Sequence, residues 1–392
     1  MGRRRRQTPS IKPSTPPMTM PVRWWSDLPD DLLDVVYSKV AGPLNRVRFA
    51  AVCRSWRATA TTSLHAAPPV LPWLMFNDAR QDGDKTMVYC PEDGQVFRMS
   101  LPRRAVGKRF VGAYDGGWVA ALGHDMQLAV VNLFSGVEAR LAAWNMHGLS
   151  LGGGRNDIQK IVFSESPAST GCILATITPR YGLALCRIGC RYNKWTEEGP
   201  VHELVDIVFC NGQLFGLTVF ERLLRFQIVV DHDGKPMVTG QPHQIRTDSC
   251  PTFHPKNIVD LHGKPAMVVR TLSSSCEAFC GPSFKVFELV DDDDESTAEH
   301  AHKWEEATSL GDYAVFLGKR WSKVAYVPAV GRGGLQRNCI YSTDDLLRSS
   351  TRLEDRGGRN LYPTSDRDAM SKIRSFVVAR APGGMWVLPP DF

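Results

Sequence analysis

Two pairs of cysteines have a spacing that could hold a metal ion. Cys186 and Cys190 are separated by three residues, as are Cys276 and Cys280, and structural zinc sites use such closely spaced thiolates when two pairs converge in space. The pairs lie in or beside predicted β-strands, where a spacing of four places both side chains on one strand face. All ten cysteines are scattered through apolar segments, which is typical of buried thiols in a reducing compartment. We therefore predict no metal site.

A second candidate is Asp231-His232-Asp233-Gly234, a string similar to the start of a calcium-binding loop. The twelfth position of that loop would be Pro242, which cannot supply the bidentate carboxylate that the loop requires. We interpret the segment as a β-turn between two strands.

The remaining patterns do not predict catalysis. The glycine-rich stretches 152–154 and 331–334 do not continue into a Lys-Ser/Thr pair or a GxGxxG helix, so neither cradles a phosphate. The ten histidines include no HExxH motif. The acidic run Asp291–Glu295 is interpreted as a solvated loop between strands, with contact to a basic partner as the alternative. We predict no catalytic residues and no cofactor.

One segment near the N-terminus has the periodicity of a helix. Pro29 stands at a helix start, where its missing N–H costs nothing, and Asp30 and Asp31 follow in the first turn, where negative charge is favourable. Gly42-Pro43 ends this helix, and a second apolar set follows among arginines. The segment has more apolar positions than it can bury alone, and those of the first helix are Leu28, Leu32, Val35, Val36 and Val40.

This segment resembles the F-box, a helical module that binds the Skp-type adaptor of cullin-based ubiquitin ligases. The resemblance rests on Leu28-Pro29, Asp31-Leu32-Leu33, the spaced Val36 and Val40, and the string Val52–Arg57. Ala50 and Ala51 depart from the family, which more often has larger residues there. An ordinary helical hairpin that caps the next domain is the alternative. The resemblance implies an adaptor-binding surface made of Leu28, Pro29, Leu32, Leu33, Val36, Val40, Val47, Val52 and Trp56.

The composition is that of a soluble globular protein. Of the 392 residues, 43% are apolar and 22% charged, and no apolar run is long enough to predict a membrane span. Six of the 47 basic residues lie within residues 1–23, so the remaining 41 balance the 41 acidic ones and the net charge of +6 belongs to this tail. A neutral body argues against nucleic-acid binding.

The basic tail, residues 1–22, combines arginines and prolines with few large apolar residues, so we expect it to be disordered. The run Arg3–Arg6 is either a nuclear import signal or part of a solvated tail. The chain shows neither a secretory segment nor an N-glycosylation sequon. We expect an intracellular protein, located in the nucleus, the cytoplasm or both.

The rest of the chain indicates β-structure. After a proline-containing linker, short runs of Val, Ile, Leu, Phe and Tyr alternate with Gly, Asp, Asn and Pro. A hairpin pattern, Ile207–Leu217 with Asn211-Gly212 at its turn, recurs about fifty residues later as Ile258–Val269 with His262-Gly263. Units of this length predict a β-propeller, for which we expect six blades, with seven as the alternative.

This region resembles the KIB-type propeller of a plant family of F-box proteins of unknown function. The motifs are Phe110–Trp118, the turn Leu133–Gly136 and the ending Trp386–Pro389, in that order; Leu133 replaces the proline that often follows the asparagine. We therefore expect a mainly β protein with a disordered tail (1–22), an F-box (23–65), a linker (66–75) and a propeller (76–392).

The resemblances imply a non-catalytic subunit of an SCF-type (Skp-cullin-F-box) ubiquitin ligase. Its F-box would bind the Skp-type adaptor and through it a cullin, and its propeller would bind a protein target whose identity the sequence does not reveal. Two alternatives remain. One is an enzyme or a small-molecule-binding propeller, and the other is an F-box scaffold that does not assemble a ligase.

Overall fold

The structure of the chain, a computed structural model, describes twenty segments. These are residues 25–40, 43–62, 70–76, 84–92, 95–142, 145–146, 158, 160–178, 182–191, 194–200, 204–240, 243–245, 256–271, 283–291, 302–318, 321–327, 335–343, 361–363, 374–378 and 384–390. The chain divides into two compact units, with the division between Ala66 and Ala67.

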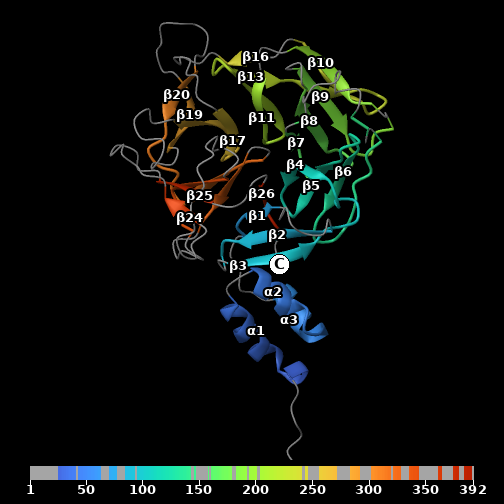
Figure 1. The fold of residues 1–392 in the computed structure, drawn as a ribbon, viewed down its shortest axis with the longest axis vertical. Helices are drawn as coiled ribbons and strands as arrows, with labels where there is room; N and C mark the ends of the chain where they lie inside the picture. Colours follow the sequence, from blue (N-terminus) through green and yellow to red (C-terminus); the bar gives the residue numbers. More distant parts are fainter. Residues whose placement is uncertain are drawn as a thin grey trace, which may run out of the picture. The chain divides into compact units, whose positions relative to one another are not determined.

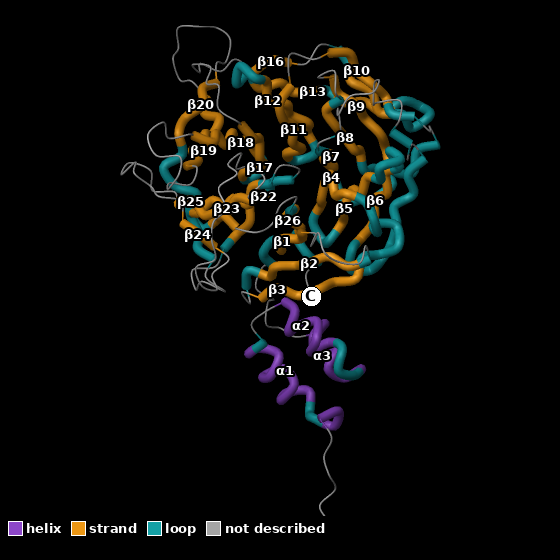
Figure 2. Tube along the Cα trace, viewed as in Figure 1, coloured by secondary structure: helices purple, strands orange, loops and turns teal. Residues whose placement is uncertain are grey.

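The N-terminal unit is helical. Its elements are the 3-10 helix η1 (Trp25–Asp27), α1 (Asp30–Lys39), α2 (Pro43–Ala50) and α3 (Arg54–Thr62). Pro29 is the N-cap of α1, with Asp30 and Asp31 in its first turn and Lys39 in its last, so charges at both ends match the helix dipole. The predicted helix is therefore confirmed. In contrast to this helical unit, the described part of the second unit consists of strands and loops (Figure 2).

The second unit contains twenty-six described strands. In chain order they are β1 (Trp73–Phe76), β2 (Lys85–Cys90), β3 (Gln95–Ser100), β4 (Arg109–Tyr114), β5 (Trp118–Leu122), β6 (Leu128–Asn132), β7 (Ile161–Phe163), β8 (Ile173–Ile177), β9 (Gly182–Arg187), β10 (Thr196–Pro200), β11 (Leu204–Cys210), β12 (Gln213–Thr218), β13 (Leu223–Phe226), β14 (Ile228–Val230), β15 (Pro236–Val238), β16 (His243–Ile245), β17 (Lys256–Leu261), β18 (Lys264–Thr271), β19 (Ser283–Asp291), β20 (His302–Glu306), β21 (Tyr313–Leu317), β22 (Lys323–Tyr326), β23 (Cys339–Thr343), β24 (Leu361–Pro363), β25 (Arg374–Val378) and β26 (Met385–Val387).

These strands form sheets that follow one another around a ring, as the colour sequence in Figure 1 shows. The sheets have the strand orders β26-β1-β2-β3, β4-β5-β6, β10-β9-β8-β7, β11-β12-β13-β16, β17-β18-β19-β20 and β22-β21-β23-β25-β24, and β14-β15 is a separate hairpin. The ring is closed by the two ends of the unit, because β1 pairs with β26 and Leu74 lies opposite Trp386. This arrangement is a β-propeller, and the predicted mainly β fold is confirmed.

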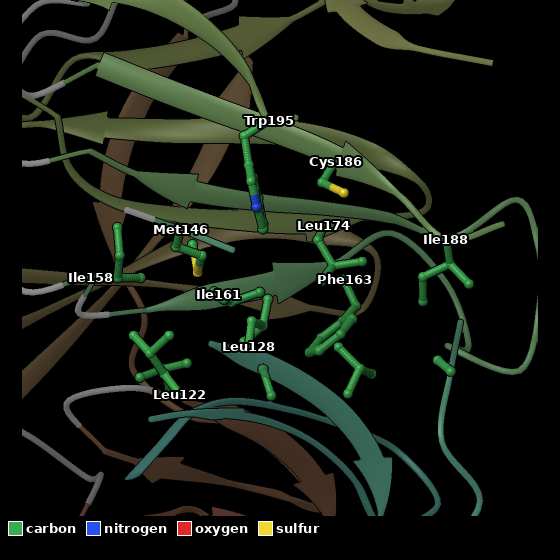
Figure 3. Packing of buried hydrophobic residues seen from close by; sticks show 14 of the residues in the cluster. Leu122, Leu128, Met146, Ile158, Ile161, Phe163, Leu174, Cys186, Ile188 and Trp195 are labelled. Atoms are coloured by element: carbon green, nitrogen blue, oxygen red, sulfur yellow. The ribbon is translucent and has the colours of Figure 1, made fainter. Parts of the chain in front are cut away.

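Hydrophobic packing between neighbouring sheets holds the ring together. Figure 3 shows side chains of the β4-β5-β6 sheet, such as Leu122 and Leu128, facing Ile161, Phe163 and Leu174 of the next sheet. Comparable clusters fill the spaces between the next three pairs of sheets. Inner strands such as β5, β6 and β7 are therefore buried on both faces and are continuous apolar runs. The outer strand β20, by contrast, contains both exposed and buried residues.

A buried carboxylate also links three sheets. Asp206 of β11 accepts hydrogen bonds from the Lys160 ammonium at 2.7 Å, from its neighbour Ile207 N at 2.9 Å, and from Ile258 N of β17 at 3.0 Å. Lys160 immediately precedes β7. The side chains of Lys160 and Asp206 are 11% and 5% exposed, so this pair is a buried ion pair between sheets that otherwise pack through apolar side chains.

Both hairpins of the predicted repeat are confirmed. Cys210 pairs with Gln213 around Asn211-Gly212, and Leu261 pairs with Lys264 around His262-Gly263. All four turn residues have positive φ angles, between 49° and 79°, as the tight turns of twisted hairpins require. The Asn211 amide donates to the Gly263 carbonyl at 3.3 Å, so the two turns lie side by side.

The last sheet departs from the simple meander. β21 and β22 are antiparallel, whereas β21 with β23 and β23 with β25 are parallel. Parallel neighbours require crossover connections, and segments on either side of β24 lie outside the described residues. The number of six blades stays a prediction.

Candidate functional site

The helical unit has a small aromatic interior. Leu33, Tyr37 and Phe49 are buried, and the rings of Tyr37 and Phe49 are 5.1 Å apart. The Trp56 ring lies 4.4 Å from Phe49, and its indole N–H donates to the Trp25 carbonyl at 3.1 Å. This hydrogen bond ties the start of the unit to α3, so its first residues are held against its last helix.

The other face of α1 is apolar and exposed. Leu32 is 49% exposed and Val36 39%, and their spacing of four residues places them together on the helix surface. Val35 adds to this face, and Val52 at the α2–α3 turn is 53% exposed. The described part of this unit thus buries three large apolar side chains and leaves five exposed, namely Trp25, Leu32, Val35, Val36 and Val52. Such a surface is characteristic of a protein-binding site.

The residues that the F-box resemblance assigns to adaptor binding occupy three environments. Pro29, Leu32, Val36 and Val52 are exposed; Leu28, Val40 and Trp56 are half-buried and pack against the interior; Leu33 is fully buried. The side chain of Val47 lies outside the described residues. Leu33 therefore acts within the unit, by holding α1 in place. Sequence reasoning did not include Trp25, which is 74% exposed; its position next to the LP pattern was the available signal.

The calcium-like string is a turn. It joins β14 to β15, and the Asp231 carboxylate accepts from the backbone N–H groups of Asp233 and Lys235 at 3.0 and 2.8 Å. The side-chain donor atoms of Asp231, His232 and Asp233 lie within 4.8 Å of one another. Because the backbone already occupies an oxygen of Asp231, this closeness follows from the turn itself. The predicted turn between strands is confirmed.

The cysteine pair that the structure describes does not share a strand face. β9 ends at Arg187, and the chain turns at Gly189, whose φ is 77°. The expectation that Cys186 and Cys190 point to one side of a strand is therefore wrong. The Cys190 thiol instead donates to the Asp233 carbonyl at 3.5 Å. The second pair, Cys276 and Cys280, and the acidic run after Asp291 lie outside the described residues.

A hollow of about 730 Å³ lies beside β6. Its charged lining groups are Arg104, Lys108, Glu138 and Arg140, and Arg104 pairs with Glu138 at 3.2 Å. The sequence contains one Gly-x-Ser-x-Gly string, 148–152, which lies outside the described residues. The nucleophile elbow of this pattern joins a strand to a helix, whereas the described elements on either side of it are the strands β6 and β7.

The three propeller motifs noted in the sequence meet around one turn. Asn132 donates to the Gly116 carbonyl at 2.7 Å, Leu133 N donates to the Gly117 carbonyl at 2.9 Å, and Gly117 N donates to the Leu388 carbonyl at 2.8 Å. A Cβ at Gly117 would lie 2.3 Å from the Phe134 ring, so glycine is required there. The motifs therefore fasten the C-terminal end of the ring to the β4–β5 turn.

Together, these features define a class of protein: a closed β-propeller in the same chain as a separate three-helix unit with an exposed apolar face. None of the described helices is long and apolar enough to cross a membrane.

The chain belongs to the KIB1-4 β-propeller family, whose pattern it matches over residues 88–369. It is 23% identical to F-box protein At5g55150 of Arabidopsis thaliana over 83% of this chain and 87% of that protein. It is 21% identical to F-box protein At2g26160 of Arabidopsis thaliana over 84% of this chain and 98% of that protein. YCF48 from Cyanidioschyzon merolae is a solved structure with 12% identity and a TM-score of 0.32, covering 58% of this chain and 70% of that one. The resemblance to plant F-box proteins with a KIB-type propeller is confirmed.

Proposed function

We propose that this protein is the substrate-recognition subunit of an SCF-type ubiquitin ligase. Its helical unit would bind the Skp-type adaptor, and through it a cullin, while its propeller would bind a target protein. The exposed apolar face of α1 carries this proposal, because it lies opposite the side of α1 that fills the unit's own interior. The F-box names of the two Arabidopsis relatives support the same role.

The nine assigned residues contribute in two ways. Pro29, Leu32, Val36 and Val52 would contact the adaptor directly, since they are exposed. The half-buried residues and Leu33 would shape and support that surface, and the resemblance assigns Val47 to it as well. The domain boundaries proposed with this role are 1–22 for the tail, 23–65 for the F-box, 66–75 for the linker and 76–392 for the propeller.

The proposed contribution to ubiquitination is proximity. The subunit would hold lysines of the target close to a ubiquitin-loaded enzyme, which raises the rate without a bond-making residue of its own. No cofactor or metal ion is part of this role. We propose that the protein acts inside the cell, in the nucleus, the cytoplasm or both.

Co-purification tests the proposal. The tagged full-length chain should retain a Skp-type adaptor and a cullin, and the double variant Leu28→Ala, Pro29→Ala should lose both while its propeller stays folded, as judged by circular dichroism. The control is Val137→Ala, which changes an exposed apolar side chain of the propeller. Equal retention of the adaptor by the double variant and by the control would contradict the proposal.

A further inference from the structure

Exposed apolar side chains gather at one end of the β11-β12-β13-β16 sheet. Val205 is 40% exposed, Val219 36% and Phe220 50%. Leu204, the first residue of β11, pairs with Thr218, the last residue of β12. Val205 therefore lies beside the β12–β13 turn, which carries Val219 and Phe220. We name Val205, Val219 and Phe220 the edge patch.

Buried groups from the neighbouring sheet hold this turn in one conformation. The Lys256 ammonium of β17 pairs with the Glu221 carboxylate at 2.9 Å and donates to the Val219 carbonyl at 3.0 Å. The side chains of Lys256 and Glu221 are only 3% and 4% exposed. The Trp304 indole of β20 donates to the Glu221 carbonyl at 3.0 Å. These buried contacts therefore hold the turn that carries Val219 and Phe220 of the edge patch in one conformation.

Two backbone irregularities occur at the same place. Glu221 has a φ of 63°, a left-handed conformation that is unfavourable for residues other than glycine and tends to occur at functional sites. The pairing register of β11 shifts between Leu204 and Asp206, and a bulge of this kind re-aims a side chain, here that of Val205.

The exposed charged side chains of the β12–β13 hairpin are basic. From Gln213 to Phe226 the sequence contains one acidic residue, Glu221, and its charge is compensated by Lys256 inside the protein. Arg222 and Arg225 in the same stretch are exposed. A partner that covers the edge patch would therefore bind more favourably if it carried carboxylates next to its own apolar side chain.

We propose that the edge patch binds an acidic segment of a partner protein, with a large apolar side chain of that segment on Phe220 and a carboxylate at Arg222. This inference rests on the proposed function, because the segment would belong to the target that the propeller presents. A rigid aromatic side chain suits such a contact, since little conformational freedom is lost when it is covered.

Peptide selection tests the inference. Random twelve-residue peptides displayed on phage are selected on the full-length protein, and the consensus peptide is synthesised and titrated by fluorescence anisotropy. We expect a consensus with Asp or Glu beside Leu, Ile, Phe or Trp. Phe220→Ser and Arg222→Glu should each weaken its binding at least tenfold, roughly the effect of removing a central contact, whereas Val137→Ser should change it less than about twofold.

A selection that yields no peptide dependent on Phe220, or a consensus without acidic residues, overturns the inference. So does a self-association of the full-length chain that Phe220→Ser abolishes, since a second copy would then be the occupant. Thermal unfolding of both variants shows that lost binding is not lost folding. The selection needs no adaptor, so its failure leaves the adaptor result intact, and a failed adaptor test leaves the peptide result intact.

Discussion

Replacing Asp206 by alanine should destabilise the propeller strongly. The carboxylate accepts hydrogen bonds from Lys160 at 2.7 Å, from Ile207 N at 2.9 Å and from Ile258 N at 3.0 Å. Removing it leaves an ammonium and two backbone N–H groups without this acceptor, at the place where three sheets meet. Lys160 is 11% exposed, so water compensates for little of the loss.

The expected cost is about 4–6 kcal/mol. Breaking a buried ion pair by removing one partner costs about 3–5 kcal/mol, because the remaining charge is uncompensated. The loss of the acceptor for the two backbone N–H groups adds about 1 kcal/mol, the cost of roughly one hydrogen bond. In the double variant Lys160→Met, Asp206→Ala the unpaired charge is absent, so that variant should be at least about 1 kcal/mol more stable than Asp206→Ala alone.

Urea unfolding of the full-length protein, followed by tryptophan fluorescence and circular dichroism, measures these differences. The matched control is Glu306→Ala, which breaks the Lys285–Glu306 pair; its N–O distance is 2.9 Å, but its side chains are 35% and 40% exposed. Exposed pairs contribute less than about 1 kcal/mol. The reasoning is refuted if Asp206→Ala costs no more than this control, or if the double variant is the least stable of the set.

Two further predictions concern the ring closure and the thiols. Trp386 is fully buried, its indole donates to the Leu317 carbonyl at 3.1 Å, and its strand closes the ring. Trp386→Ala should lower the free energy of unfolding by about 3–5 kcal/mol. A thermal midpoint equal to that of wild type would contradict this account of closure. A hydrogen bond from Ser55, then one from the Trp56 backbone, lowers the pKa of Cys53, whereas burial raises the pKa of Cys172 to about 11. In iodoacetamide labelling of the native protein at neutral pH, followed by peptide mass spectrometry, Cys53 should therefore react before Cys172. The reverse order would show that exposure and thiolate content do not determine the labelling rates of these two cysteines.

Local patterns predicted the fold well where the chemistry of a turn or a helix start is local. Asn211-Gly212 and Pro29 are examples, because positive φ angles and helix N-termini each favour few residue types. Pairing across long distances was not predictable. The β1–β26 closure joins residues more than three hundred positions apart in the sequence, and no local preference of Leu74 specifies Trp386 as its partner. The parallel pairs of β23 are a further case, since register between distant strands depends on the whole sheet.

The candidate site was predictable in composition but not in orientation. Helical spacing identified one apolar set, and the structure divides it between the interior and the surface. Its members are Leu28, Leu32, Val35, Val36 and Val40. Leu33, adjacent to Leu32, is buried because Tyr37 and Phe49 lie on its side of α1. The edge patch gave no sequence signal, because its exposure depends on Lys256 reaching Glu221 from another sheet.

The affinity of the full-length protein for a purified plant Skp-type adaptor tests the central claim most directly. Biolayer interferometry of wild type, Val36→Asp and Val137→Asp compares a charge placed on the exposed face of α1 with the same charge at an exposed valine of the propeller. We predict that wild type and Val137→Asp bind with affinities within about twofold of each other, and that Val36→Asp binds at least tenfold more weakly, a loss of about 1.4 kcal/mol or more. Equal binding of all three proteins, or no binding by wild type, would contradict the assignment of the helical unit as the adaptor-binding surface.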